Sequence, residues 1–143
     1  MTYLSPVERE QVAVTAHLLD QGRLIHGAAL VLMAVATIAV LITPANPWAL
    51  GVLIIGVIEL TLAIRVSFDA ALFHRIAATG DAIHLDQAMN ELTLMPTEKA
   101  GRPWLDRCHG ARRLLTGQAL ALTAQCVLVV AFATIGANGS AFL

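Results

Sequence analysis

The sequence predicts an all-α integral membrane helical bundle with three transmembrane helices. Of its 143 residues 57% are hydrophobic and only 13% are charged, and the mean hydropathy is +0.73. A soluble domain of this length needs more charged surface than that. The excess of hydrophobic residues lies in three apolar runs, at 24–42, 48–66 and 114–135. Each has the roughly 20 residues that a helix needs to cross about 30 Å of hydrocarbon, where lipid offers the backbone no other partner.

Residues 1–22 are predicted to form an amphipathic helix on the cytoplasmic side. Ser5 can cap this helix, Pro6 suits its first turn, and Glu8 completes a capping box. The helix is expected to run to about Asp20, with Gly22 as its stop. Because the charges are mixed rather than basic, we expect the helix to pack on other cytoplasmic helices rather than on the membrane surface. Its apolar stripe consists of Val7, Val14 and Leu18.

Residues 23–66 are predicted to form a transmembrane hairpin with spans at about 24–42 and 48–66. Pro44 closes the first span and Asn46 can cap the second, so the connection is tight and the two helices are antiparallel.

Residues 67–112 are predicted to form a small cytoplasmic helical region. The second helix should extend into it as far as Thr79 and Gly80, because the intervening sequence lacks Pro and Gly and has apolar residues every four positions. A short amphipathic helix over 82–92 and a loop over 95–101 follow.

Pro103 then opens a long helix that enters the third span. Residues 113–143 comprise that span, at about 114–135, and a short tail.

The basic residues fix the expected orientation. All nine Lys and Arg residues are Arg9, Arg23 or lie within 65–113, and none occurs in 43–47 or after 135. The positive-inside rule therefore predicts a multi-pass inner-membrane protein with a cytoplasmic amino terminus and the carboxyl terminus on the opposite side. Acidic residues nearly neutralise the cytoplasmic surface, which argues against nucleic acid as a partner.

Glu59 is the principal candidate functional residue, because a carboxylate near the middle of a span is costly unless it is neutral or paired. Arg65 lies about 120° round the helix and is not a suitable partner. We expect Glu59 to hydrogen-bond to Gln125 or Thr37. Such an interhelical hydrogen bond stabilises a membrane bundle by about 1 kcal/mol. The alternatives are a proton or cation site, alone or repeated around an oligomer, and a contact with another membrane subunit.

A second group of charged residues is expected at the cytoplasmic mouth or interface of the bundle. Arg65 and Asp69 have the i, i+4 spacing of an ion pair, and Arg112 and Arg113 can extend along the helix to the lipid headgroups. These contacts would account for most of the group. The alternative is a charged vestibule that leads to Glu59. The members are Arg65, Asp69, His74, Arg75, Arg112 and Arg113.

No catalytic or metal-ligand motif is present, so the sequence predicts neither an enzyme nor a metal site. His17, His74 and His84 are expected to be solvated or interfacial. His26, His74 and His109 raise the question of haem, but their levels along the spans match poorly, and no cofactor is predicted. Two cysteines would lie about 27 Å apart on one helix, which is too far for a disulfide; they are Cys108 and Cys126.

These observations favour a small non-catalytic membrane subunit that anchors or scaffolds a complex through its spans and cytoplasmic helices. Small residues such as Gly117 and Ala121 allow close helix approach, which favours a homo-oligomer or other membrane subunits as partners. The alternative hypothesis is a homo-oligomeric proton or cation pathway through Glu59. The third is a haem- or quinone-associated electron-transfer anchor.

Overall fold

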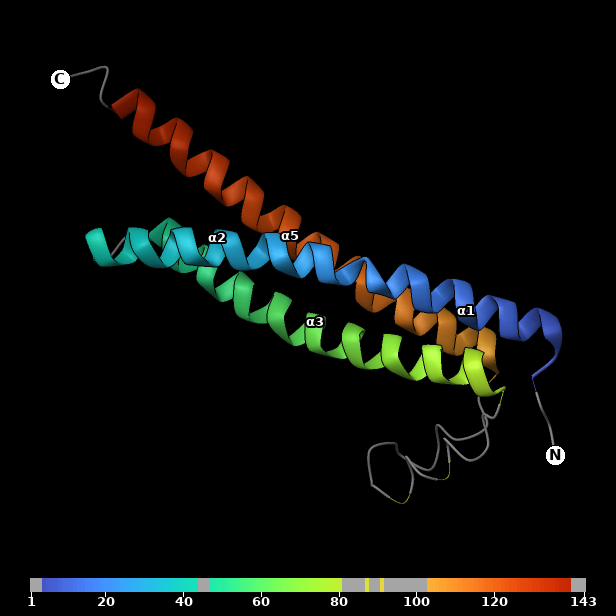
Figure 1. Ribbon diagram of the computed structural model, residues 1–143. Helices are drawn as coiled ribbons and strands as arrows, with labels where there is room; N and C mark the ends of the chain where they lie inside the picture. Colours follow the sequence, from blue (N-terminus) through green and yellow to red (C-terminus); the bar gives the residue numbers. More distant parts are fainter. Residues whose placement is uncertain (1–3, 44–46, 81–86, 88–90, 92–102, 140–143) are drawn as a thin grey trace.

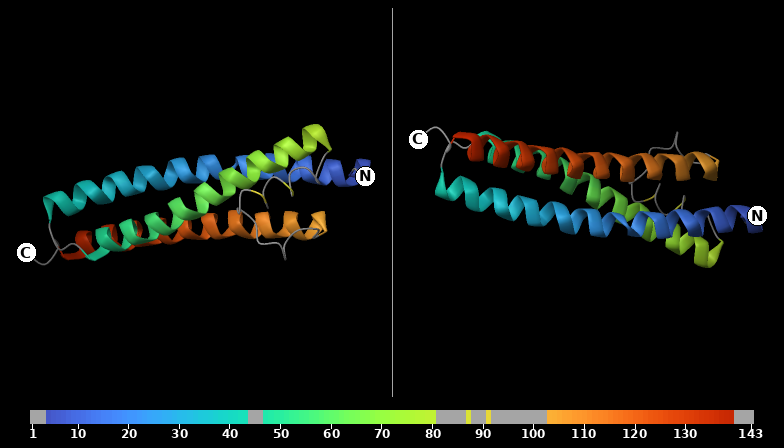
Figure 2. Two further views of the ribbon diagram at one scale, coloured as in Figure 1. Left: turned by 90° about the horizontal axis from the view of Figure 1, so that it is seen from below. Right: turned by 90° about the horizontal axis from the view of Figure 1, so that it is seen from above.

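The computed structural model describes residues 4–43, 47–80, 87, 91 and 103–139, with side chains described as far as Thr134. Its long elements are all helices: α1 (Pro6–Asp20), α2 (Gly22–Ile42), α3 (Pro47–Thr79) and α5 (Trp104–Gly139). The all-α prediction is therefore confirmed for this part of the chain. α1 and α2 lie in line, and the resulting rod runs beside α3 and α5 (Figures 1 and 2).

Three helical segments are long and apolar enough to cross a membrane, as the hydropathy pattern predicts. They are Pro6–Ile42, Pro47–Thr79 and Trp104–Thr134. Each is longer than the roughly 20 residues that a bilayer requires, so each has a part that extends beyond its apolar run.

The amino-terminal helix begins and ends at the predicted residues, Pro6 and Asp20, but Gly22 does not have the predicted role. The Ser5 amide donates to Glu8 Oε2 at 2.8 Å, and the Glu8 amide donates to Ser5 Oγ at 3.3 Å, which completes the capping box. The Ser5 hydroxyl also donates to Glu8 Oε2, and this hydrogen bond together with the one from the Ser5 amide lowers the pKa of the Glu8 carboxyl. The expected stop at Gly22 is wrong: Gln21 keeps right-handed helical backbone angles, and the Ile25 amide donates to its carbonyl, so α2 follows with hardly a break.

The predicted end of the second long helix and the predicted start of the last one are confirmed. α3 continues beyond the apolar run to Thr79, where Gly80 takes the left-handed backbone angle φ of 69° that favours glycine. Arg9 also contacts this end of α3, since its guanidinium donates to the carbonyls of Ala77 and Ala78 at 2.6 and 2.7 Å. α5 starts directly after Pro103, whose carbonyl accepts from the Asp106 amide.

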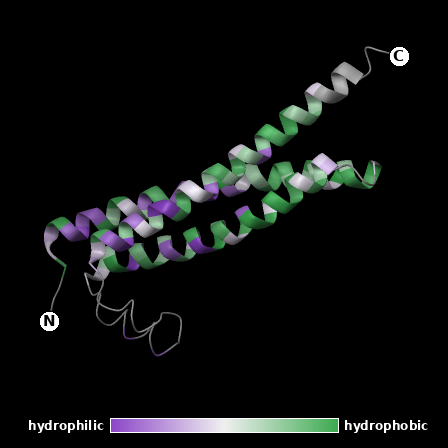
Figure 3. Ribbon diagram, turned by 180° about the vertical axis from the view of Figure 1, so that it is seen from behind, coloured by the Kyte–Doolittle hydropathy of each residue, from purple (hydrophilic) through white to green (hydrophobic). Residues whose placement is uncertain are grey.

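The molecule divides into two halves along its length, as the hydropathy colouring in Figure 3 shows. We call α1 with 67–79 of α3 and 104–113 of α5 the polar half. The apolar half is α2 with 47–66 of α3 and 114–139 of α5. The predicted short helix over 82–92 and the loop over 95–101 lie outside the described residues, apart from Gln87 and Glu91.

The polar half has the larger hydrophobic core. α1 contributes Val12, Ala16 and Leu19 to it, and all three are fully or almost fully buried. α1 therefore packs on other helices, as expected, but not through Val7, Val14 and Leu18, because these side chains are exposed. A helix that carries two apolar faces can bury only one against a single pair of neighbours. The remaining core residues are Ala70, Phe73, Ile76, Cys108 and Ala111, together with Val66 from the adjoining end of the apolar half.

The apolar half is packed less extensively. Its buried hydrophobic cluster consists of Ala36, Ala49 and Val52, with partly buried neighbours around it. The carboxyl-terminal part of α5 diverges from α2 and α3 (Figures 1 and 3). Large side chains such as Leu41 and Ile54 are exposed here, as suits helices surrounded by lipid.

Candidate functional site

Glu59 lies at the centre of a polar cluster that joins three helices inside the apolar half. Its side chain is wholly buried. Oε2 lies 3.0 Å from His26 Nδ1 on α2, and Oε1 accepts a hydrogen bond of 2.8 Å from Gln118 Nε2 on α5. Both carboxyl oxygens are therefore occupied by side chains of the same chain, each from a different helix.

Gln118 connects this cluster to the junction of α1 and α2. Its Nε2 also donates to the Gly22 carbonyl at 2.9 Å, so both amide hydrogens are used. A Cβ at position 22 would lie 2.9 Å from Gln118 Oε1 and 2.8 Å from Val66 Cγ1. Glycine is thus needed here because the backbone approaches the neighbouring helices too closely for any side chain, and not because it ends a helix.

Gln125 and Thr37 are not partners of Glu59, so the predicted pairing is corrected. Gln125 is buried, but its Nε2 donates to the Val52 carbonyl at 3.2 Å. Thr37 is exposed and donates to the Met33 carbonyl of its own helix at 2.8 Å. Thr37 lies on an exposed face of α2. Its hydroxyl needs no partner on another helix, because it donates to the carbonyl four residues earlier.

The sequence places the actual partner, Gln118, on the same helix face as Gln125, but it does not show which of the two reaches Glu59. Gln118 and Gln125 are seven residues apart, so two helical turns place them on one face of α5. Gln118 is nearer the polar end of its run, as is His26, and the tilted α3 brings Glu59 to their level. Within the described residues, Gln118 Oε1 and Gln125 Oε1 are buried acceptors with no hydrogen-bond donor.

The His26–Glu59 contact requires one proton between the two side chains. Either the imidazole donates to the carboxylate, or the carboxylic acid donates to a neutral imidazole. A neutral imidazole that donates to a carboxylate leaves a net charge of −1 on the pair. An ion pair and a neutral acid–imidazole pair carry no net charge, which an apolar interior tolerates better. His26 is partly exposed while Glu59 is enclosed, so any proton exchange with Glu59 would take place through the imidazole.

The residues predicted for the cytoplasmic mouth do not form one site. Arg65 and Arg75 are exposed, and Asp69 is half-buried. Burial raises the pKa of the Asp69 carboxyl, and the Arg65 charge lowers it by a smaller amount. His74 turns instead to α1, where its Nε2 lies 2.9 Å from Asp20 Oδ2. His17 lies beside this pair. Its side chain is 77% exposed, as expected for a solvated histidine, whereas the partly exposed His74 also has a specific partner in Asp20.

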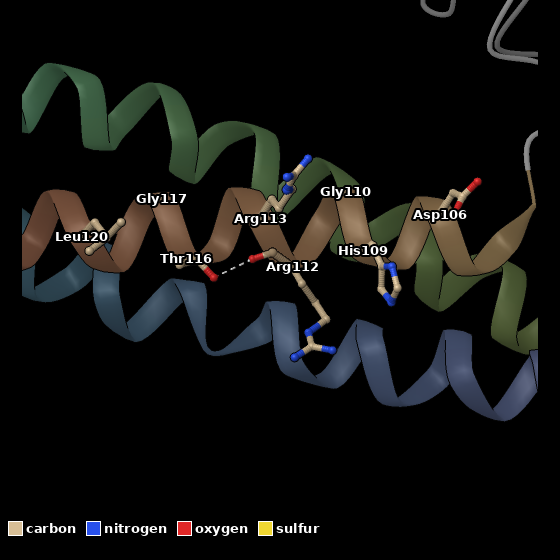
Figure 4. Close-up of a pocket in the computed structure, with 8 residues that line it drawn as sticks. All are labelled: Asp106, His109, Gly110, Arg112, Arg113, Thr116, Gly117 and Leu120. Carbon is tan, nitrogen blue, oxygen red and sulfur yellow. Dashed lines mark hydrogen bonds between the residues drawn. The ribbon is translucent and has the colours of Figure 1, made fainter.

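Arg112 and Arg113 line a groove of about 920 Å³ on α5, near the point where its apolar run begins (Figure 4). Both arginines are exposed, and their side chains point away from one another. The two guanidinium groups therefore do not converge on one anion. The described lining consists of Asp106, His109, Gly110, Arg112, Arg113, Thr116, Gly117 and Leu120.

The three histidines considered for haem have separate surroundings. His26 contacts Glu59, His74 contacts Asp20, and His109 lines the groove on α5. Among the described residues they do not share a site. Cys108 and Cys126 are both free, as the sequence predicts.

Comparison with known proteins adds no family to this description: no family model matches the chain, and neither do the curated proteins or the solved structures compared with it. The function must therefore be argued from the residues themselves.

Proposed function

We propose that this chain is a small non-catalytic membrane subunit that anchors a partner protein. The apolar half spans the inner membrane, and the polar half projects into the cytoplasm, where the basic residues lie. The carboxyl terminus lies on the opposite side.

The enclosure of Glu59 is the observation that carries this proposal. An ion pathway through a symmetric oligomer would need this carboxylate at a subunit interface or beside water. Its two oxygens instead contact His26 and Gln118 of the same chain, and its exposed fraction is 0%. Such a residue acts between the helices of its own bundle, as interhelical polar contacts in membranes do.

The outward stripe of α1 is the surface that we assign to the partner. Val7, Val14 and Leu18 are exposed, although α1 already buries its opposite face. Their spacing of seven and four residues places them within about 40° of one another on the helix. This narrow seam has the d-to-a spacing of a coiled coil, so we expect an amphipathic helix of a second subunit to lie along it.

Native mass spectrometry of the complex, extracted gently from its own membrane, tests the proposal. We expect a stoichiometric second polypeptide bound to the 15.2 kDa chain. The double variant Val14→Gln with Leu18→Gln should release that polypeptide. Leu105→Gln is the matched control, because Leu105 is an exposed apolar residue of the polar half outside the stripe.

A single species at an integral multiple of the chain mass would instead indicate a homo-oligomer and contradict the proposal. The stripe assignment alone fails if the second polypeptide is present but the stripe double variant and the Leu105 control retain it equally.

One observation favours the second candidate, a proton pathway. The partly exposed His26 touches the enclosed Glu59, which gives the carboxyl group a route for proton exchange. Proton flux in liposomes that contain the purified chain, and its loss in Glu59→Gln, would favour this candidate over the anchor. We expect no flux above that of empty liposomes.

A further inference from the structure

Three potential metal ligands meet in the polar half, where the sequence analysis predicted no metal site. Asp20 Oδ2 lies 2.9 Å from His74 Nε2 and 3.9 Å from His17 Nδ1. The three ligand atoms all lie within 4.8 Å of one another. His17 and Asp20 are one turn apart on α1, whereas His74 comes from α3, so two helices supply the cluster.

We propose that His17, Asp20 and His74 bind a divalent transition-metal ion of the zinc class. Two imidazole nitrogens and one carboxylate oxygen are the ligand set of many zinc sites. Calcium and magnesium prefer oxygen ligands and are poorly matched by it.

The distances suit this assignment. Bonds of about 2.0–2.2 Å to a tetrahedral ion place neighbouring ligand atoms about 3.3 Å apart. The observed separations lie on both sides of that value, so small side-chain rotations suffice. The His17 side chain is 77% exposed and is free to turn without disturbing the core.

Three protein ligands leave a fourth coordination position open, and the structure provides room for it. A cavity of about 320 Å³ adjoins the cluster, with Asp20 and His74 in its wall. Arg23 and Ser67 also line this cavity, so a water or a small anion at the fourth position would have polar neighbours. The bound ion would fasten α1 to α3 beside the junction with α2.

The cluster has a metal-free explanation that the experiment must separate. His74 and Asp20 already form a hydrogen bond, and the His17 and His74 rings meet edge to face at 5.2 Å. If these contacts are the whole role of the three residues, added metal will find no preferred site there.

Zinc titration of the full chain in detergent micelles tests the proposal. The protein should be purified without a polyhistidine tag and stripped with a chelator, and Zn²⁺ binding measured by calorimetry. We expect one ion per chain, and the visible absorption of tetrahedral Co²⁺ when cobalt replaces zinc.

His17→Ala is the principal variant, because this exposed side chain can be removed without a cavity. It should lower the Zn²⁺ affinity at least about tenfold, since even the outer partners of metal ligands contribute that much. His109→Ala is the matched control and should bind like the natural chain, since His109 is an exposed histidine outside the cluster. His74→Ala should abolish binding, with helix content checked by circular dichroism.

Two results would overturn the proposal. One is the absence of saturable binding up to about 0.1 mM Zn²⁺, which corresponds to a binding free energy of only about −5.5 kcal/mol. The other is binding that His17→Ala and His109→Ala weaken equally, which would place the ion elsewhere on the chain.

Discussion

In the part of the chain that the structure describes, two histidine–carboxylate pairs have nearly equal lengths but very different surroundings. His26 and Glu59 lie 3.0 Å apart in the apolar half, with side chains 27% and 0% exposed. His74 and Asp20 lie 2.9 Å apart in the polar half, with side chains 42% and 41% exposed. The chemistry and the geometry are alike, so the surroundings alone distinguish the two pairs.

This difference changes what each pair contributes. Water competes for the exposed pair, which makes its net stabilisation small. No water competes for Glu59, so its partners are required: if one is removed, a polar group is left buried and uncompensated. The enclosed pair therefore holds the bundle together, whereas the exposed pair is free to serve another purpose, such as binding a metal ion.

The largest expected effect comes from breaking the enclosed pair. Glu59→Ala leaves His26 and Gln118 without their shared acceptor and creates a cavity between three helices. We expect the free energy of unfolding to fall by about 3 kcal/mol. Denaturant titration in mixed micelles, followed by circular dichroism, measures this loss.

The matched control for this variant is Glu59→Gln. Its amide has nearly the volume of a carboxyl group and retains an acceptor for Gln118, so we expect a loss of about 1 kcal/mol or less. Equal losses for the two variants would mean that the negative charge, rather than the hydrogen bonds, is what the cluster needs.

The next largest effect concerns the close approach beside the enclosed pair. Gly22→Ala would place a methyl group against Val66 and Gln118, so it should destabilise the chain by about 2 kcal/mol. Gly27→Ala on the same helix is the control, because a Cβ at position 27 meets nothing within 4 Å. The control should be neutral or slightly stabilising, since alanine favours helix. Thermal unfolding of both variants measures the difference, and similar melting temperatures would show that the junction can adjust.

The fold was largely predictable from the sequence because apolar periodicity and helix-end signals are local. Ser5 with Glu8, Gly80 and Pro103 marked helix ends correctly, since each acts on backbone groups a few residues away. The role of Gly22 was predicted wrongly because it depends on distant neighbours. A glycine that permits close helix packing and a glycine that ends a helix cannot be told apart from local sequence.

The partners within the site were less predictable, because they depend on helix tilt and rotation. The position of Glu59 identified it as a residue in need of a partner, but the sequence did not distinguish Gln118 from Gln125, which share one face of α5. The meeting of His17, Asp20 and His74 depends on how α1 lies against α3. The sequence allowed α1 two apolar faces, and only the packing decided which one was buried.

A smaller effect is expected from the exposed pair when no metal is present. Asp20→Asn should lower the free energy of unfolding by about 0.5 kcal/mol, because the pair is partly solvated. Chemical denaturation in the presence of a chelator measures this value. A loss as large as that of Glu59→Ala would contradict the contrast between the two pairs.

The smallest effect is expected at Asp69, which is half-buried in the polar half. Burial raises the pKa of this carboxyl, and Arg65 offsets only part of the shift. Its contribution to stability is therefore present below the ordinary pKa of about 4 and is lost as the pH rises through the raised folded-state value. Asp69→Asn removes the charge at nearly constant volume, so the variant should match the natural chain at low pH and be slightly more stable at pH 7. Paired denaturation curves at both pH values measure the difference. A variant that is less stable at pH 7 would mean that the attraction of Arg65 outweighs the cost of burying the carboxylate. The charge of Asp69 would then resemble that of Asp20 in the partly exposed pair with His74.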